Sequence, residues 1–519
     1  MKTSISSALF WLAAGLAAPA YTDLGNNILQ SNGTSADTQA AINAASDGYT
    51  VLIPAGSFTW SSGLKIAGKG IRLQGAGAGG LLGHSTTSVS IGTGSKTFTT
   101  QSGLELSPGQ PVRAFYTADG RNNWMEGTVI SYSGNTLVIN VSSVGGSGTK
   151  AFWTFGVLQS TLITHSAGGS VLVELSEDTS RSVEIVGIRF IEGSAPLGHH
   201  LSIDSVNGGK PVLIHDCWFS TAGAMDRSIR TTANRGVIYR CSFDSGFYSG
   251  RGDGHGNDDQ AIGFKSDHET YSWEQPSKMG MDDIDGLGNF YVEDCYFAGI
   301  YLQTMDFDGN SRAVIRYCTF NNSAMSSHGA DTGPVGTRHF QIYNNTFVFT
   351  DVGTETFGLD YWFFIRGGTG VIADNIMPNM NSSQWGSKLA IKMIVMNLQR
   401  SGGPNPCWGA GAAGSQYPAP RQVGMGRVTG MGGQDSITYR GDSEPLYIWN
   451  NVGNPVAGVV DYGGGACGSP DSSADYIVHG RDYFNDGTPK PGWQKYTYPH
   501  PFRSPSAKPS PPQNVRVSP

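Results

Sequence analysis

Acidic, basic and histidine side chains gather in one short part of the sequence. Between residues 306 and 338 stand Asp306, Asp308, Arg312, His328, Asp331 and Arg338. Histidine is scarce, with 11 in 519 residues, and His328 lies in the turn-like segment SSHGADTG. Carboxylates, an imidazole and guanidinium groups on one surface shift each other's pKa, which proton-transfer chemistry requires. If the fold brings them together, Asp306, Asp308, His328, Asp331 and Arg338 are the predicted catalytic residues.

A repeated phrase indicates how the fold could bring them together. VLIHDCWF, GVIYRCSF, FYVEDCYF, AVIRYCTF and FQIYNNTF each join β-forming residues, a polar pair, Cys or Asn, one further residue and Phe. The Cys and Asn serve as a ruler: Cys217, Cys241, Cys295, Cys318, Asn345 and Asn375. Their spacing is 23 to 30 residues, apart from one interval of 54. One strand per period of this size predicts a solenoid whose coils stack about 4.8 Å apart.

The ruler residues should form a buried column. Residues at equal positions of stacked coils lie above one another, so we expect Cys217, Cys241, Cys295 and Cys318 in one interior column with Phe beside it. Free thiols packed as core are favoured over disulfides, and nothing in the phrase makes these cysteines electropositive or exposed, as catalytic thiols are.

The same ruler places the charged residues. Counting forward from each ruler residue gives Asp306 and Asp308, then His328 and Asp331, then Glu355 and Asp360, all at nearly one phase. Counting backward gives a basic column that includes Arg312, Arg338 and Arg366. We expect one charged stripe, in which Arg312, Glu355, Asp360 and Arg366 bind substrate. The structural alternative is a ladder of neutralising pairs, which suffices for Arg181, Lys210 and Arg235.

Two further segments carry a resemblance. DTQAAINAASDGYTVLIPAGSFTW, residues 37–60, and IRLQGAGAG, residues 71–79, resemble the opening of the pectate lyase superfamily, in which a helix caps the coil before the first strand. The resemblance implies an all-β, right-handed parallel β-helix with an N-terminal capping helix. Lyases of this superfamily often use Arg or Lys as the base, which by analogy points to Arg338. β-Helices also serve as phage tailspikes and adhesins.

One stretch breaks the rhythm. Residues 90–156 are strand-like but off-period, and WMEGTVISYSGNTLVINV resembles a small β-module of phage tail fibres. We predict an inserted β-domain here, between N-terminal coils at 21–89 and the main β-helix at 157–465. Residues 466–519 are expected to form a C-terminal extension that ends in a Pro-rich linker. Cys407 and Cys467 lie outside the ladder and are predicted to form a disulfide.

Composition and the N-terminus indicate an exported protein. Lys2, an apolar run from Ala8 to Ala20 and the pattern Ala18-Pro19-Ala20 predict a signal peptide over residues 1–20. No later run approaches the roughly 18 apolar residues of a membrane span. A net charge of −7 argues against a nucleic-acid surface. We therefore expect a secreted protein; the sequence does not define its oligomeric state.

The 54-residue interval predicts a long loop or an extra coil. It holds FYSGRGDGHGNDDQ and MDDIDGLG, whose Asp residues could bind Ca²⁺, although a solvated polar turn explains them as well. No cofactor is otherwise indicated. Trp273 in this interval, together with Tyr301 and Trp362, is a candidate for stacking on sugar rings, with core packing as the alternative.

These features favour a polysaccharide as partner, lying along the coils. In a lyase, Arg would neutralise a uronate carboxylate while a base removes the adjacent proton. In an inverting glycoside hydrolase, two of Asp306, Asp308 and Asp331 would act as acid and base. A non-catalytic adhesin or tailspike-like protein is the alternative of another class. The sequence favours the lyase, because Arg accompanies the acids.

Overall fold

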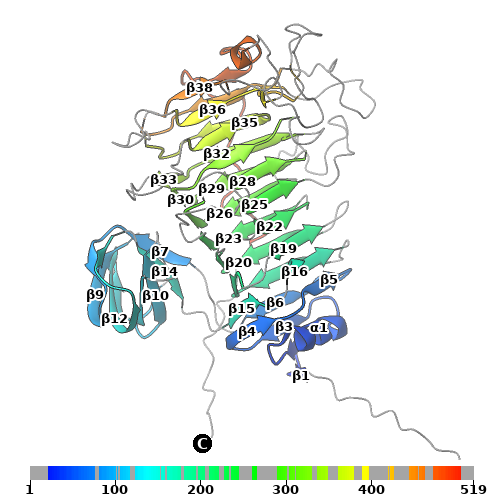
Figure 1. The fold of residues 1–519 in the computed structure, drawn as a ribbon, viewed down its shortest axis with the longest axis vertical. Helices are drawn as coiled ribbons and strands as arrows, with labels where there is room; N and C mark the ends of the chain where they lie inside the picture. Colours follow the sequence, from blue (N-terminus) through cyan, green and yellow to red (C-terminus); the bar gives the residue numbers. More distant parts are fainter. Residues whose placement is uncertain are drawn as a thin grey trace, which may run out of the picture.

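Three parallel sheets, stacked coil upon coil, form a β-helix (Figure 1). The computed structural model describes residues 21–75, 81–100, 102, 104, 106–116, 123–151, 153–157, 161–166, 168–176, 181–193, 197–204, 210–220, 227–232, 235–244, 260–265, 289–300, 303–309, 311–329, 336–348, 361–378, 389–396, 419, 421–425, 443–453, 455–461 and 472–503. The sheets are called A, B and C, in the order in which the chain passes through them within one coil. The expected all-β solenoid is confirmed.

The strands of each sheet come from successive coils. In spatial order, sheet A contains β1 (Thr22–Asp23), β2 (Ile28–Gln30), β3 (Thr50–Ile53), β6 (Arg72–Gly75), β17 (Val183–Val186), β20 (Val212–His215), β23 (Gly236–Tyr239), β26 (Phe290–Glu293), β29 (Arg312–Arg316), β32 (His339–Tyr343), β35 (Thr369–Ala373), β37 (Leu446–Trp449) and β39 (Tyr483–Phe484). Sheet B contains β4 (Gly56–Trp60), β15 (Thr161–His165), β18 (Arg189–Ile191), β21 (Trp218–Ser220), β24 (Ser242–Asp244), β27 (Tyr296–Ala298), β30 (Thr319–Asn321) and β33 (Thr346–Val348). Sheet C contains β5 (Leu64–Ala67), β16 (Gly169–Ser176), β19 (Leu197–Asp204), β22 (Arg227–Thr231), β25 (Gln260–Lys265), β28 (Gln303–Asp308), β31 (Met325–Ser327), β34 (Phe363–Ile365), β36 (Ile391–Met393) and β38 (Ala457–Val459).

A single left-handed residue turns the chain from sheet A into sheet B. The second residue of the polar pair in each phrase has φ between 50° and 57°: Asp216, Arg240, Asp294, Tyr317, Asn344 and Asp374. One residue in this conformation reverses the chain sharply, at a cost of about 1–2 kcal/mol for residues other than Gly. Because the turn has the same length in each of these coils, the residue after it always enters the core, which explains the constant phrase.

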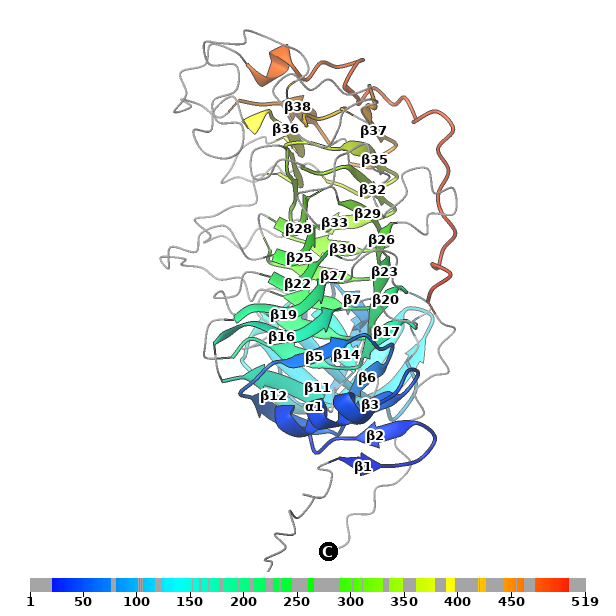
Figure 2. The same ribbon diagram turned by 90° about the vertical axis from the view of Figure 1, so that its right-hand side faces the viewer.

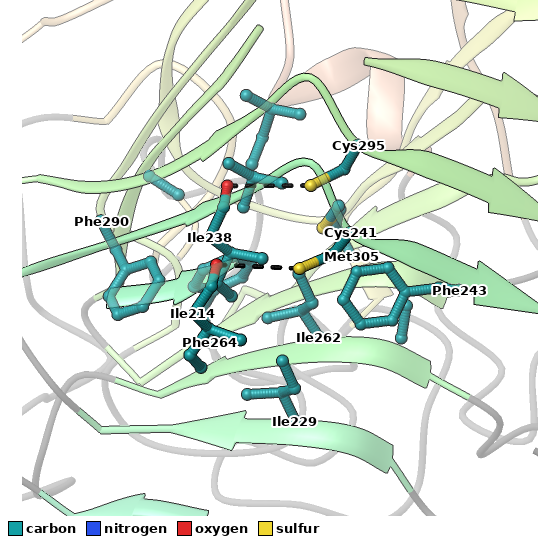
Figure 3. Close-up of a cluster of buried hydrophobic side chains, with 14 of the residues drawn as sticks. Ile214, Ile229, Ile238, Cys241, Phe243, Ile262, Phe264, Phe290, Cys295 and Met305 are labelled. Atoms are coloured by element: carbon teal, nitrogen blue, oxygen red, sulfur yellow. Dashed lines mark hydrogen bonds between the residues drawn. The ribbon is translucent and has the colours of Figure 1, made fainter. Parts of the chain in front are cut away.

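The ruler residues form the predicted interior column. Cys217, Cys241, Cys295 and Cys318 are free thiols with at most 2% of their surface exposed. Each Sγ donates to the carbonyl of a residue one coil earlier, for example Cys241 to Ile214 and Cys295 to Ile238, both at 3.7 Å (Figure 3). The neighbouring Phe side chains stack from Phe190 to Phe347 with ring centroids 4.8–5.3 Å apart.

Asparagine continues this column with stronger hydrogen bonds. Asn345 donates through Nδ2 to the carbonyl of Ile315 (2.9 Å) and accepts the backbone N–H of Cys318 through Oδ1 (2.9 Å). Asn375 and Asn451 repeat the arrangement in the next two coils. The late strand β37 therefore belongs to the same ladder.

The 54-residue interval is a single coil. β23 pairs directly with β26, and β24 with β27, so no further coil separates Cys241 from Cys295. The extra sequence flanks β25, at residues 245–259 and 266–288, which are outside the described residues. Of the two alternatives, the extra coil is therefore wrong.

Helix α1 (Ser35–Ala44) and an inserted sheet complete the N-terminal part (Figure 1). α1 contacts β2, β3 and β5 and covers the end of the coils, as predicted. The insert is antiparallel, in the order β7 (Leu81–Ser85), β14 (Trp153–Val157), β10 (Pro111–Tyr116), β11 (Trp124–Ser133), β12 (Thr136–Gly145) and β9 (Gly94–Thr99), with β8 (Val89–Ser90) paired to β13 (Thr149–Lys150). It begins at Leu81, before the expected boundary at residue 90, because β7 pairs with β14.

The insert packs on the outer face of sheet B. Phe115 of β10 stacks on Trp218 of β21 with ring centroids 4.4 Å apart, and both side chains are buried. Arg189 lies over the same indole at 3.9 Å, and His84 lies 6.1 Å from Tyr296. Aromatic contacts of this kind stabilise an interface beyond the area that they bury.

Residues 485–503, here called the strap, run back along the outer face of sheet A (Figure 2). Trp493, Tyr496 and Phe502 pack on the outward tyrosines and aliphatic side chains of that sheet. Below them, fully buried Arg316 donates to Glu293 and to the backbone carbonyls of Tyr496 (2.8 Å) and Thr497 (2.6 Å). The predicted linker after residue 503 and the predicted signal peptide lie outside the described residues, as do Cys407 and Cys467.

We predict that Asn345→Ala destabilises the fold by about 2–4 kcal/mol, because it leaves two buried backbone groups, the N–H of Cys318 and the carbonyl of Ile315, without their partner. Urea unfolding measures the loss. Asn485→Ala is the control, since exposed Asn485 makes one long contact at 3.4 Å. Equal effects of the two substitutions would contradict the role of the ladder.

A buried histidine gives a second prediction. His200 is fully buried, lies 6.0 and 5.9 Å from Phe190 and Phe219, and makes no hydrogen bond through either ring nitrogen within the described part of the chain. Burial, with smaller contributions from His165 and His199, lowers the pKa of His200 to about 3. The unfolded chain binds this proton below about pH 6.5 and the folded chain does not, so stability falls as pH decreases from there toward the folded pKa.

His200→Leu should remove this pH dependence. At pH 5 the substitution should recover about 2 kcal/mol relative to its effect at pH 8, measured as the change in unfolding free energy at the two pH values. Other histidines contribute equally to both proteins and cancel in the comparison. A wild-type and variant difference that is the same at both pH values would contradict the assignment.

Candidate functional site

The outer face of sheet C carries the candidate site. In β28, Met305 and Phe307 point into the core, so Asp306 and Asp308 point outward. Strand register places Gly263 and Ser326 directly beside Asp306 in the two neighbouring coils. His328 and Arg366 follow the last residues of β31 and β34 on the same side of the sheet.

Asp306, His328 and Arg366, here called the triad, meet at one atom. Nε2 of His328 lies 2.7 Å from Oδ1 of Asp306 and 2.7 Å from Nη2 of Arg366. Arg366 is held in place by the backbone carbonyl of Ser327 (3.0 Å) and the hydroxyl of Ser326 (3.1 Å). The three residues come from successive coils of sheet C, as the ruler predicts for Asp306 and His328.

This geometry offers His328 a partner in each protonation state. A neutral Nε2 accepts a hydrogen bond from the Arg366 guanidinium, whereas a protonated Nε2 donates to Asp306. When Nε2 carries the proton of a neutral ring, Nδ1 is the basic atom. In each state one of these two neighbours is complementary to Nε2 and the other is not, although both lie 2.7 Å away.

The carboxyl group of Asp306 is kept ionised. Burial by itself would raise its pKa, but the charge and hydrogen bond of His328, together with Arg227 and Arg366, hold the pKa well below its ordinary value. A buried carboxylate is tolerated only with such partners. Asp306 is therefore suited to stabilise a cation or orient a base, and not to donate a proton.

A polar row extends the triad along the sheet. Arg227 of β22 donates through Nε to Gln260, whose Nε2 donates to Gln303 at 2.7 Å. Nη2 of Arg227 lies 3.9 Å from Oδ2 of Asp306. Arg227 can reach across because Gly263 lies between them: a Cβ there would approach Cδ of Arg227 to 2.6 Å.

Exposure rises toward the N-terminal coils. The side chains of Asp306 and His328 are 3% and 9% exposed, Arg227 is 14% exposed, and Arg230 and Asp204 are 37% and 40% exposed. A ligand lying along the coils would reach the triad from the side of Arg230. The side chains of Asp306 and His328 are thus nearly buried.

The other predicted catalytic residues are placed as follows. Asp308 is buried on the same strand face, and its Oδ1 accepts the N–H of Gly309 at 2.7 Å. Arg338 directly precedes β32 of sheet A. It is also buried, and it donates to Glu444 (2.8 Å) and Thr369 (3.2 Å). Asp331 lies outside the described residues. The structure therefore groups Arg338 with Glu444 instead of with the triad.

The predicted substrate-binding residues divide in the same way. Arg366 belongs to the triad. Arg312, the first residue of β29, is buried beside His339, the first residue of β32 in sheet A. Trp362 is fully buried in the core and donates to the carbonyl of Pro378, so the core-packing alternative holds for it. Tyr301, Trp273, Glu355 and Asp360 lie outside the described residues.

Sequence reasoning missed Arg227, Gln260, Gln303 and Glu444. The first three share one register position in sheet C, which an alignment of RSIRT, QAIGF and QTMDF would have shown. Glu444 follows a long interval without a ruler residue, so no sequence signal placed it.

Within the described ranges, no three His, Cys, Asp or Glu side chains gather closely enough to bind a metal ion. The Asp-rich segments considered for Ca²⁺ fall outside those ranges. Among the helices that the structure describes, none has the length and apolar character needed to cross a membrane.

Gly263 provides a test of the Arg227 placement. We predict that Gly263→Ala destabilises the protein by about 1–3 kcal/mol, because the new methyl group overlaps Arg227. In the double variant with Arg227→Ala, most of this loss should disappear. Gly169→Ala, also in sheet C, is the control, since nothing lies within 4 Å of its added Cβ. Urea unfolding of the wild type and these three variants gives their unfolding free energies, and a double variant no more stable than Gly263→Ala would refute the packing.

Comparisons with known proteins do not assign the chain to a family. No family model matches the chain, and no match is found among curated proteins. Among solved structures, the tailspike gp61 of Pseudomonas phage phi297 is similar at 14% sequence identity with a TM-score of 0.15. The match covers 69% of this chain and 65% of the tailspike chain, just under two thirds of its length. The three-sheet architecture rests on the strand pairings described above.

Proposed function

We propose that the protein is a secreted polysaccharide lyase that cleaves an acidic glycan by β-elimination at the triad. The observation that carries the proposal is the meeting of Asp306, His328 and Arg366 at Nε2 of His328. The resemblance of its opening segment to the pectate lyase superfamily supports the same reaction class.

Each residue has a role in this reaction. His328 removes the proton on the carbon next to a uronate carboxyl group, and Asp306 stabilises the imidazolium that forms. The electron pair of the broken C–H bond becomes the new C=C bond as the glycosidic C–O bond breaks, and the leaving oxygen takes a proton from water while the imidazolium returns its proton to solvent. Arg366 and Arg227 neutralise the substrate carboxylate, which acidifies that proton.

Arg338 does not suit the role of base. Its guanidinium lies 2.8 Å from Oε2 of Glu444 and is 2% exposed, so it is paired with a carboxylate and is not accessible to a substrate on sheet C. Within the lyase proposal, His328 therefore replaces Arg338 as the base.

An inverting glycoside hydrolase is the second candidate. Asp306 and Asp308 lie two residues apart on one face of β28, which separates their Cα atoms by about 6.6 Å. Inverting enzymes hold their two carboxyl groups roughly 6.5–9.5 Å apart. In this reaction one carboxyl group would protonate the leaving oxygen and the other would activate water. A protein that only binds glycan is the third candidate.

A polysaccharide panel separates these three functions. The lyase generates an unsaturated uronate that absorbs ultraviolet light, together with new reducing ends; a hydrolase generates reducing ends alone; a binding protein generates neither. We expect the first result with uronate polymers such as polygalacturonate, alginate or hyaluronan.

His328→Gln should lower kcat by about 10²- to 10⁴-fold while thermal stability stays close to that of the wild type. His479→Gln is the matched control, because His479 is 45% exposed and lies near the C-terminal end of the described chain. Full activity of His328→Gln would exclude His328 as the base. Reducing ends without ultraviolet absorbance, abolished by Asp308→Asn, would establish the hydrolase instead.

A further inference from the structure

An aromatic pair lies on the outer face of sheet C, two coils beyond Asp306. In β34, Phe363 and Ile365 enter the core, so Phe364 points outward. Register places Asp306, Ser326 and Phe364 in one column of consecutive coils. At the spacing of adjacent strands, Phe364 is roughly 10 Å from Asp306 along the molecule.

The rings of Tyr361 and Phe364 stack on each other. Their centroids are 5.1 Å apart with an interplanar angle of 23°, and both side chains are half-buried. Outward positions of a half-solvated sheet are ordinarily polar. Two half-buried aromatic side chains here form an aromatic surface next to a cluster of charges.

Cations stand on both sides of this surface. Nζ of Lys392, the next residue of the Phe364 column, lies 5.6 Å from the centre of the Tyr361 ring. Cζ of Arg366 lies 5.7 Å from the centre of the Phe364 ring. Since Arg366 is also part of the triad, the aromatic surface and the triad are continuous.

A second stacked pair shows that stacking of two aromatic rings does not by itself mark a ligand site. Tyr447 and Phe484 on sheet A have ring centroids 5.1 Å apart at 11°, and they are also half-buried. That pair packs beside His479 near the C-terminal end of the sheet. The sheet C pair differs in being framed by Lys392 and Arg366 in the column of Asp306.

We propose that Tyr361, Phe364 and Lys392 form a subsite for a uronate residue of an anionic glycan. The C–H face of the sugar ring packs on the aromatic surface, and its carboxylate pairs with Lys392. The subsite lies too far from Asp306 to hold the reacting residue, so it holds another residue of the same chain. This inference rests on the proposed function for the reaction at the triad.

Binding measurements test the subsite apart from the reaction. Calorimetric titrations use the His328→Gln protein, so that turnover does not interfere, with oligomers of polygalacturonate, alginate and hyaluronan and with dextran as the neutral probe. Phe364→Ala and Lys392→Gln should each raise the Kd of the bound uronate oligomer about tenfold. Phe484→Ala is the matched control and should leave the Kd unchanged.

The outcomes distinguish the two proposals. An unchanged Kd in both Phe364→Ala and Lys392→Gln, equal effects of Phe364→Ala and Phe484→Ala, tighter binding of dextran, or no binding of any uronate oligomer would overturn the subsite. Cleavage of a uronate polymer with an unchanged Kd in these variants removes the subsite and leaves the lyase. Binding that requires Phe364 and Lys392, without any cleavage product from the wild type, keeps the subsite and removes the lyase.

Discussion

Backbone hydrogen bonding between coils fixes the positions of the side chains on the three parallel sheets. Since strands of adjacent coils lie about 4.8 Å apart, residues at equal positions are forced into columns. Inside, such columns can be uniform, as the cysteines and phenylalanines are. Outside, like charges stacked at this distance repel. The column through Asp306 accordingly places uncharged Gly263 and Ser326 on either side of the carboxylate.

Burial on the outer face of sheet C makes an ionised side chain costly at the triad. Asp306 is 3% exposed, and a carboxylate that is buried alone would not stay ionised. The fold offsets this cost with a histidine and two arginines that come from different coils, each positioned by strand register or by a turn. Such an arrangement contributes little to stability compared with apolar packing of the same volume. Its presence on this face therefore favours a functional reason.

The sequence predicted features that depend on the constant turn between sheets A and B. The Cys and Phe column is an example, because one left-handed residue precedes each ruler position. Counts that crossed the other two turns were less reliable, since those turns vary in length. Arg338 and Arg366 were thus placed in one basic column, although Arg366 follows a strand of sheet C and Arg338 precedes one of sheet A. Glu444, after an interval without a ruler, could not be placed at all.

The three outer faces differ in what covers them, and this difference is the reason for placing the proposed glycan on sheet C. The insert packs on sheet B through Phe115, and the strap packs on sheet A through Trp493 and Tyr496. Both contacts bury aromatic side chains against residues of the chain itself, so those areas are already occupied. Sheet C carries the titratable triad, the polar row and the half-buried aromatic pair in adjoining coils. An extended glycan that lies along the coils would meet all three groups in turn, which an approach to either of the other faces would not allow.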